Sequence, residues 1–318
     1  MKREVREDRE QISAVTFALM LRMVPQIGEK TLGRLLRTGL SQQISPEDFL
    51  SLPSAIWRSQ FELDKRTVSI LEAERTTLPG KALEMARFLR LSEVQLITCM
   101  SVSYPDRMER FDDSPPPMLM AKGDIRLFSP EDRNGFTFTV AISRGHSPFS
   151  LDKQEEVSNS LIAQGGIPVT GHDRIPYQRL ALTAQRQNRP VLYLLDRGLR
   201  EVLGPEMDRP PFAAARIREQ TFNSERDLMV SPFRLDDHSL GSNNRRRDRL
   251  VAAMSDIIVA VDVSPEGEML GLCRRAQAQG KAVVACSEGR GGCSTLLREG
   301  AIPLTKSIDA SALLQPAG

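Results

Sequence analysis

The sequence predicts an α/β protein with an extended Rossmann-like, doubly wound and mostly parallel sheet, preceded by a small all-helical domain. From about residue 94 onward, short apolar runs alternate with segments of helix length. Several of these runs are apolar at every position, as strands covered on both faces require. Before residue 93, apolar residues recur only at helical spacing. These observations place the change of architecture near residue 93.

Residues 1–92 form the predicted helical domain. The break at Pro25–Gly28 separates a first helix from a second, and the Ile27-Gly28 pair suggests a helix-hairpin-helix or sterile-alpha-motif arrangement, with ordinary helix packing as the alternative. Ser45 is a predicted N-cap because Pro46 suits the first helical position. Two further helices are predicted at about 64–75 and 80–90. The highly charged residues 1–10 are expected to be flexible.

Residues 93–310 form the predicted Rossmann-like domain, and residues 311–318 are expected to be a C-terminal tail. Residues 200–226, rich in Arg, Pro and Ala, are predicted to be a long loop. The predicted strands are 94–97, 117–120, 138–142, 167–169, 191–195, 228–230, 257–261 and 282–285. The predicted crossover helices lie near 151–164, 176–187, 245–255, 268–279 and 294–299.

Composition excludes several classes of protein. The chain has 43 Lys and Arg against 41 Asp and Glu, so it is not a uniformly cationic polyanion binder. Aromatic residues make up only 5%, which argues against a base-stacking platform. No apolar run is long enough for a signal peptide or a membrane span, so we expect a cytoplasmic protein without membrane association. The four cysteines show no metal-ligand spacing, so we expect reduced thiols and no metal.

Polar and basic residues follow two predicted strands at the ends where parallel sheets bind ligands. Ser143 and Arg144 follow the strand at 138–142, and Thr170, Gly171 and Arg174 follow the next. Hydroxyls, guanidinium groups and a glycine turn at a helix start are typical of a phosphate site, with an ordinary polar turn as the alternative. No GxGxxG or Walker motif is present, so no dinucleotide or other cofactor is predicted.

A basic cluster precedes the predicted strand 257–261. Four arginines within five residues at the start of a helix oppose the helix dipole unless an anion is bound there. A nucleic-acid backbone supplies such an anion. The alternative is a solvated charged face partly paired with Asp248. The candidate residues of this cluster are Asn244, Arg245, Arg246, Arg247 and Arg249.

The residues give no convincing catalytic set. Ser143, His146 and Asp173 supply the residue types of a hydrolytic triad, but nothing in their spacing fixes the geometry that a triad needs. We therefore predict that the protein is not an enzyme.

The order of these segments resembles the DNA-processing protein A (DprA/Smf) family over most of residues 12–305. The strongest similarity is that of residues 247–256 to the family's "RNRiIAgLSd" segment, and Ile142-Ser143-Arg144 stands where the family has Gly-Ser-Arg. The remaining similar segments are Tyr104-Pro105, Pro115–Leu119, Lys122-Gly123, Leu161–Gly166, Val169–Gly171, Asp196–Leu199 and Gly292–Ala301.

The sequence also departs from the family pattern. Ile142 replaces a glycine, Asp248 replaces an asparagine, and the family's "A.GID..AH" residues are missing after Gly171. Residues 266–271 replace a glycine-bearing segment. Loss of glycine removes close backbone approach to a phosphate. No C-terminal winged-helix domain is expected, because too few residues follow the sheet.

The resemblance implies single-stranded DNA binding, protection of that strand and loading of the recombinase RecA during transformation, by a non-catalytic homodimer. Arg144, Arg174 and the cluster at 245–249 are the residues expected to follow the phosphate backbone. Two alternatives belong to other classes. One is a nucleotide-binding sensor, and the other is a partner-binding component of a defence or mobile-element system that has lost nucleic-acid binding.

Overall fold

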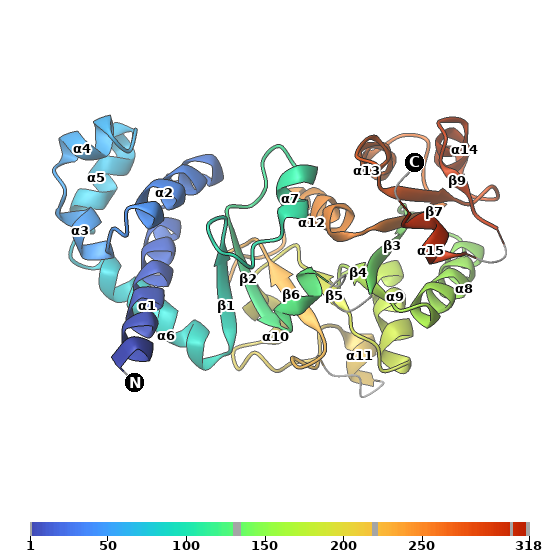
Figure 1. Cartoon of the computed structure of the whole chain (residues 1–318), viewed down its shortest axis with the longest axis horizontal. Coiled ribbons are helices and arrows are strands. Elements are labelled where there is room, and N and C mark those ends of the chain that lie inside the picture. The colour runs from blue at the N-terminus through green and yellow to red at the C-terminus, as the bar shows by residue number, and fades with distance from the viewer. Residues whose placement is uncertain (1, 130–134, 218–221, 306–307, 316–318) are drawn as a thin grey trace. The chain divides into compact units, whose positions relative to one another are not determined.

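The computed structural model describes residues 2–129, 135–217, 222–305 and 308–315, with the side chains of residues 2–11 left out. It divides into two compact units (Figure 1). The first unit contains residues 1–104 and 116–121, and the second contains residues 105–115 and 122–318. The first unit thus extends beyond the predicted boundary at residue 92, because the first strand groups with the helices.

The first unit is mainly helical. Its core is aromatic, with the Phe49 ring 5.5 Å from that of Phe17 and 6.0 Å from that of Trp57. As predicted, Ser45 caps a helix, since its side chain accepts a hydrogen bond from the Asp48 amide. The elements are α1 (Lys2–Met23), α2 (Glu29–Ser41), α3 (Pro46–Ser51), α4 (Ser54–Ser59), α5 (Lys65–Ala73), α6 (Leu78–Leu91), β1 (Val94–Thr98) and the first residues of β2 (Met118–Gly123).

The second unit is a doubly wound parallel sheet. Seven of its strands lie in the order β6-β5-β4-β3-β7-β8-β9, and their pairs are parallel. Winding reverses between β3 and β7, which makes this the switch point where such sheets bind ligands. The strands are β3 (Phe136–Ile142), β4 (Gly166–Thr170), β5 (Leu192–Leu194), β6 (Leu228–Ser231), β7 (Ile257–Asp262), β8 (Ala282–Ala285) and β9 (Ile302–Pro303).

Helices cover both faces of this sheet, as right-handed crossovers require. α8 and α9 pack together below the sheet in Figure 1, whereas α12 and α13 pack together on the other side. The helices are α7 (Asp106–Phe111), the 3₁₀ turn η1 (Ile125–Phe128), α8 (Pro148–Ala163), α9 (Ile175–Arg186), α10 (Leu199–Leu203), α11 (Ala213–Ile217), α12 (Gly241–Met254), α13 (Glu268–Ala278), α14 (Gly291–Arg298) and α15 (Ala310–Leu313).

The predicted fold class is confirmed, and each predicted strand coincides with one of β1 to β8. The differences concern short elements. The stretch 200–226 holds most of α10 and all of α11 instead of being only a loop, with 218–221 outside the described residues. α15 reaches into the expected tail, and α1 begins at Lys2, so its backbone is helical across most of residues 1–10. Among the described residues, no helix has the length and apolar character needed to cross a membrane.

Candidate nucleic-acid interface

Three segments far apart in the sequence meet at the carboxyl ends of the strands. They are the loop of residues 143–147 after β3, the loop of residues 171–174 after β4, and the N-terminal half of α12. Arg247 of α12 pairs with Asp173 of the second loop. The guanidinium groups of Arg174 and Arg247 lie 5.4 Å and 4.7 Å from the centre of the same Tyr177 ring. The loop after β4 and α12 are therefore neighbours, and Arg174 Nη2 also lies 3.5 Å from the carbonyl oxygen of Ile142 at the end of β3.

Arg247 is the centre of this arrangement, and it is fully buried, with 0% of its surface exposed. Its Nε donates to the Asp248 carboxylate at 2.8 Å, and its Nη1 donates to Asp173. The Tyr177 hydroxyl donates to the same Asp248 carboxylate at 2.6 Å. A buried guanidinium needs such partners, because an uncompensated interior charge is very costly. The sequence predicts that Arg247 binds phosphate. In the structure its guanidinium is buried, so it has no exposed surface with which to contact a phosphate.

The other arginines of the cluster lie on the outside of α12. Arg245 and Arg249 are exposed, and they share one face because they are four residues apart. Arg249 Nε is 3.5 Å from the carboxylate of Glu268, the first residue of α13, and both side chains are partly exposed, at 45% and 37%. Arg246 is half-buried with its guanidinium 5.6 Å from the centre of the Phe233 ring. Arg245 and Arg249 can therefore approach a phosphate.

The cluster does not begin its helix, contrary to the expectation from the sequence. α12 begins at Gly241, and its first turn contains no acidic residue. The arginines occupy its second and third turns, so the unfavourable helix-dipole effect, which fades beyond the first turn, does not apply to them. Asn244 is half-buried within the same helix.

The remaining predicted residues differ in what they offer. Arg144 is exposed and Arg174 is half-buried, so both guanidinium groups reach solvent. The Ser143 hydroxyl accepts from the Ser264 amide at 3.1 Å, and the buried Thr170 hydroxyl donates to the Tyr177 carbonyl at 3.2 Å. Both hydroxyls thus have structural partners.

Gly171 is buried and has a packing role. A Cβ atom at this position would lie 2.8 Å from the Tyr177 ring and 3.0 Å from the Arg247 side chain. Contacts shorter than about 3 Å are not tolerated by packed carbon atoms. Glycine here therefore lets Arg247 and Tyr177 come together under the loop. The arginines that reach solvent beside this loop and along α12 define a surface that we name the arginine edge: Arg144, Arg174, Arg245 and Arg249.

Sequence reasoning missed a buried pair beneath this edge. His172 Nδ1 lies 3.9 Å from the carboxylate of Asp196, which is itself buried and receives hydrogen bonds from Arg197 and Ser239. Burial lowers the pKa of His172 to about 4, against the opposing attraction of Asp196. The imidazole is therefore neutral at pH 7. The sequence did hold a signal for this pair. His172 follows β4 by two residues and Asp196 follows β5 by two residues, so both lie at the carboxyl ends of neighbouring strands.

The described residues do not bring Ser143, His146 and Asp173 together as a hydrolytic triad. His146 Nδ1 has no hydrogen-bond partner there, whereas the Ser143 hydroxyl accepts from Ser264 and the Asp173 carboxylate pairs with Arg247. No group of three or more His, Cys, Asp or Glu residues within the described part of the chain is placed to hold a metal ion. Burial raises the pKa of Cys273 to about 12, which leaves that thiol unreactive.

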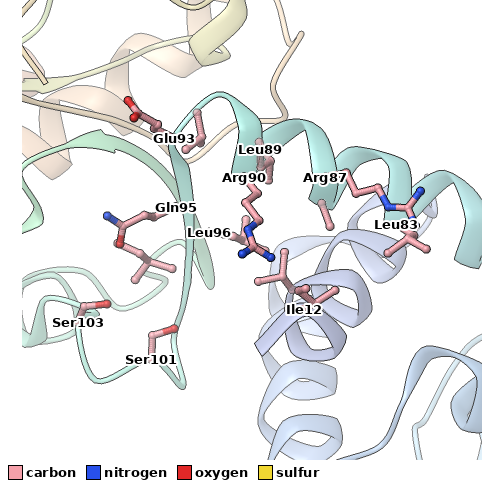
Figure 2. Close-up of a pocket in the computed structure, with 14 residues that line it drawn as sticks. Ile12, Leu83, Arg87, Leu89, Arg90, Glu93, Gln95, Leu96, Ser101 and Ser103 are labelled. Carbon is pink, nitrogen blue, oxygen red and sulfur yellow. The ribbon is translucent and has the colours of Figure 1, made fainter. Parts of the chain in front are cut away.

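A separate cavity of about 760 Å³ lies in the first unit, between α1, α6 and β1 (Figure 2). Arg87 and Arg90 of α6 line it together with Ile12 of α1 and Gln95 of β1. Residues of the arginine edge do not line this cavity.

The helix start at Ile27-Gly28, where the sequence suggests a helix-hairpin-helix arrangement with ordinary helix packing as the alternative, is poorly suited to bind a phosphate. Gly28 caps α2, but Glu29 follows in its first turn, so this helix start carries a negative charge of its own. A carboxylate at that position already interacts favourably with the helix dipole and repels a phosphate.

Comparison with known proteins agrees with this architecture. The family model for DNA recombination-mediator protein A matches residues 95–315, more than half of the chain, and the chain belongs to this family. No curated protein sequence matches the chain.

Two solved structures share the fold. A crystal structure of DprA from Streptococcus pneumoniae has a TM-score of 0.64 and 17% identity, covering 93% of this chain and 96% of that one. A structure of DprA from Helicobacter pylori, described by its "unique single-stranded DNA binding mode", has a TM-score of 0.51 and 19% identity. It covers 67% of this chain and 92% of that one.

We expect Arg247→Met to destabilise the second unit severely. The substitution leaves Asp173 and Asp248 without their buried counter-charge, which costs about 3–5 kcal/mol of the free energy of unfolding. Arg245→Met removes the same charge from an exposed position of the same helix, so it should change stability by less than about 0.5 kcal/mol. Urea unfolding of both variants measures the difference. Equal stability of R247M and the parent protein would show that the buried pairs do not hold the edge together.

We expect stability to fall in mild acid because of His172. Its pKa is 6.5 when unfolded and about 4 when folded, so between these values only the unfolded state binds the proton. The free energy of unfolding should therefore decrease as pH drops from 6.5 to 4, with a limiting slope of about 1.4 kcal/mol per pH unit. His172→Asn should flatten this part of the profile, measured by urea unfolding at pH 7.5, 6, 5 and 4. A parallel profile in the variant would contradict the assignment.

Proposed function

We propose that the protein binds single-stranded DNA through its phosphate backbone along the arginine edge. One observation carries the proposal: Arg144 and Arg174 follow the carboxyl ends of β3 and β4, and exposed arginines lie on α12, which pairs with the loop after β4. Guanidinium groups bind phosphate oxygens in paired hydrogen bonds, which suits a charged strand. Family membership supports a role in DNA processing.

The proposal includes a mode of binding. The exposed side chains of the arginine edge are cations, and phosphate contacts carry no sequence information, so binding should depend on salt and little on sequence. We propose that no bond is broken. In this role the bound strand is protected and presented to a RecA-type recombinase by a cytoplasmic homodimer, as the resemblance to DprA implies. The single-stranded DNA named for the Helicobacter pylori protein supports the choice of ligand.

We expect the double variant Arg245→Ala/Arg249→Ala to bind an oligonucleotide about tenfold more weakly than the parent protein. The slope of log affinity against log salt should also become shallower, by about 0.7 for each phosphate of a single strand that the variant no longer neutralises. Fluorescence anisotropy with labelled single- and double-stranded oligonucleotides at several salt concentrations measures both quantities.

Arg274→Ala is the matched control for this measurement. Arg274 lies on α13, where it pairs with Glu299 outside the arginine edge, and its side chain is half-exposed. Removing it subtracts a positive charge from the same unit without touching the proposed contacts. An equal loss of affinity in R274A would reduce the proposal to nonspecific charge. Unchanged affinity in the double variant would place the DNA elsewhere.

A second candidate is a small nucleotide ligand, and a different observation favours it. His172 Nδ1 and Asn244 Oδ1 are buried and lack a hydrogen-bond partner among the described residues, and such atoms are usually satisfied by water or a ligand. A nucleotide bound there would raise the melting temperature by mass action. A thermal shift with a nucleotide panel, but no oligonucleotide binding, would favour this candidate over the first.

A further inference from the structure

Arg290 lies in the loop between β8 and α14, and its guanidinium reaches the loop after β3. Its Nη1 donates to the carbonyl oxygen of Arg144 at 3.0 Å, and its Nη2 donates to that of Ser143 at 3.2 Å. Its Nε pairs with the carboxylate of Asp262 at the end of β7. One side chain thus joins three segments at the switch point of the sheet. The two carbonyls that it bonds belong to Ser143 and Arg144, which stand in place of the family's Ser-Arg.

Two glycines bring Arg290 within reach. A Cβ atom on Gly289 would lie 2.4 Å from the Val261 carbonyl oxygen, and one on Gly292 would lie 2.3 Å from that of Ser264. Backbone atoms cannot move aside as a flexible side chain does. The start of α14 therefore rests directly on the chain that leaves β7, and the Gly292 amide donates to the Val263 carbonyl at 3.0 Å. Close approach, and not an unusual backbone angle, is what these glycines provide.

Asp262 holds the same loop from its other end. Its carboxylate accepts from the Ser150 hydroxyl, in the first turn of α8, at 2.7 Å. Its backbone carbonyl accepts from the Ser143 amide at 2.8 Å. Burial tends to raise the pKa of Asp262, but the hydrogen bonds from Arg290 and Ser150 outweigh it and lower the pKa. The carboxylate is therefore charged at neutral pH and keeps its pairing with Arg290.

These contacts decide which way the peptide groups of the loop face. In a trans peptide the C=O and the following N–H point in opposite directions. Since the carbonyls of Ser143 and Arg144 point to Arg290, the N–H groups of Arg144 and Gly145 point away from it. Gly145, with φ of +73°, then turns the chain in a left-handed conformation toward α8. The Arg144 side chain leaves this loop exposed to solvent.

We infer that Arg290, together with Asp262, is a positioning residue that presents Arg144 to a DNA phosphate. The inference rests on the proposed function for its ligand, whereas the ordering of the loop stands on the contacts alone. Arg290 itself is committed to the protein, because its Nε and both terminal nitrogens have protein acceptors. It acts through Arg144 instead of touching the strand.

The test compares Arg290→Met, R144A and the double variant. R290M should lower affinity for a labelled single-stranded oligonucleotide about fivefold to tenfold, and the double variant should bind no more weakly than R144A alone. Without DNA, amide hydrogen exchange of residues 143–147 should accelerate in R290M and stay unchanged in R274M, the control for charge. Arg290→Lys keeps the positive charge but lacks the planar guanidinium that bonds both carbonyls, so it should behave like R290M. It replaces R290M in the test if R290M folds poorly.

Other outcomes overturn the inference. If the loss of affinity in the double variant equals the product of the losses in R144A and R290M, and hydrogen exchange is unchanged, Arg290 contacts phosphate directly. Unchanged exchange and unchanged affinity in R290M would remove any role in positioning. Faster exchange in R290M, in a protein whose R144A variant binds DNA normally, would overturn the proposed use of this loop for DNA and leave only the ordering of the loop by Arg290.

Discussion

The ion pairs of the buried Arg247 are the interaction on which the arginine edge depends. A guanidinium without solvent contact joins α12 to the loop after β4 through Asp173, and its Nε donates to Asp248, which also accepts from Tyr177. Because a buried charge without its ion-pair partners is very costly, these pairs favour one arrangement of the helix relative to the loop. The position of α12 relative to the strand ends, and with it the position of its exposed arginines, is therefore fixed. Interior electrostatics thus set the geometry of the surface.

The fold could be predicted from the sequence because its signals are strong and local. Short apolar runs mark the strands β3 to β8, several of them apolar at every position, and the chain between them has crossover length. The short elements could not be predicted, because α10 and α11 have five residues each and β9 has two. Elements of that length form through tertiary contacts more than through their own propensity. The predicted start of α12 is too late, since Gly241 and Ser242 resemble a turn.

The candidate site could be predicted less completely, for a physical reason visible in α12. Four arginines in five residues look equivalent in composition, yet a helix turns them to different sides. Arg247 stands three, four and seven residues before Leu250, Val251 and Met254, which are all buried. That spacing puts it on the apolar face, so helical periodicity would have identified it as interior. The partners Asp173 and Tyr177 come from tertiary contact and leave no such signal.

The loop after β3 is ordered without the glycine that the resemblance places at residue 142. Ile142 fills the core with 3% of its surface exposed, so the flexibility of glycine is absent where the loop begins. Order is supplied from the opposite side of the switch point, by Arg290 and by Gly289 and Gly292, which allow its close approach. A guanidinium that satisfies backbone carbonyls fixes peptide orientation as a tight glycine turn does. The conformation of this loop is therefore held by a side chain 146 residues further along the sequence.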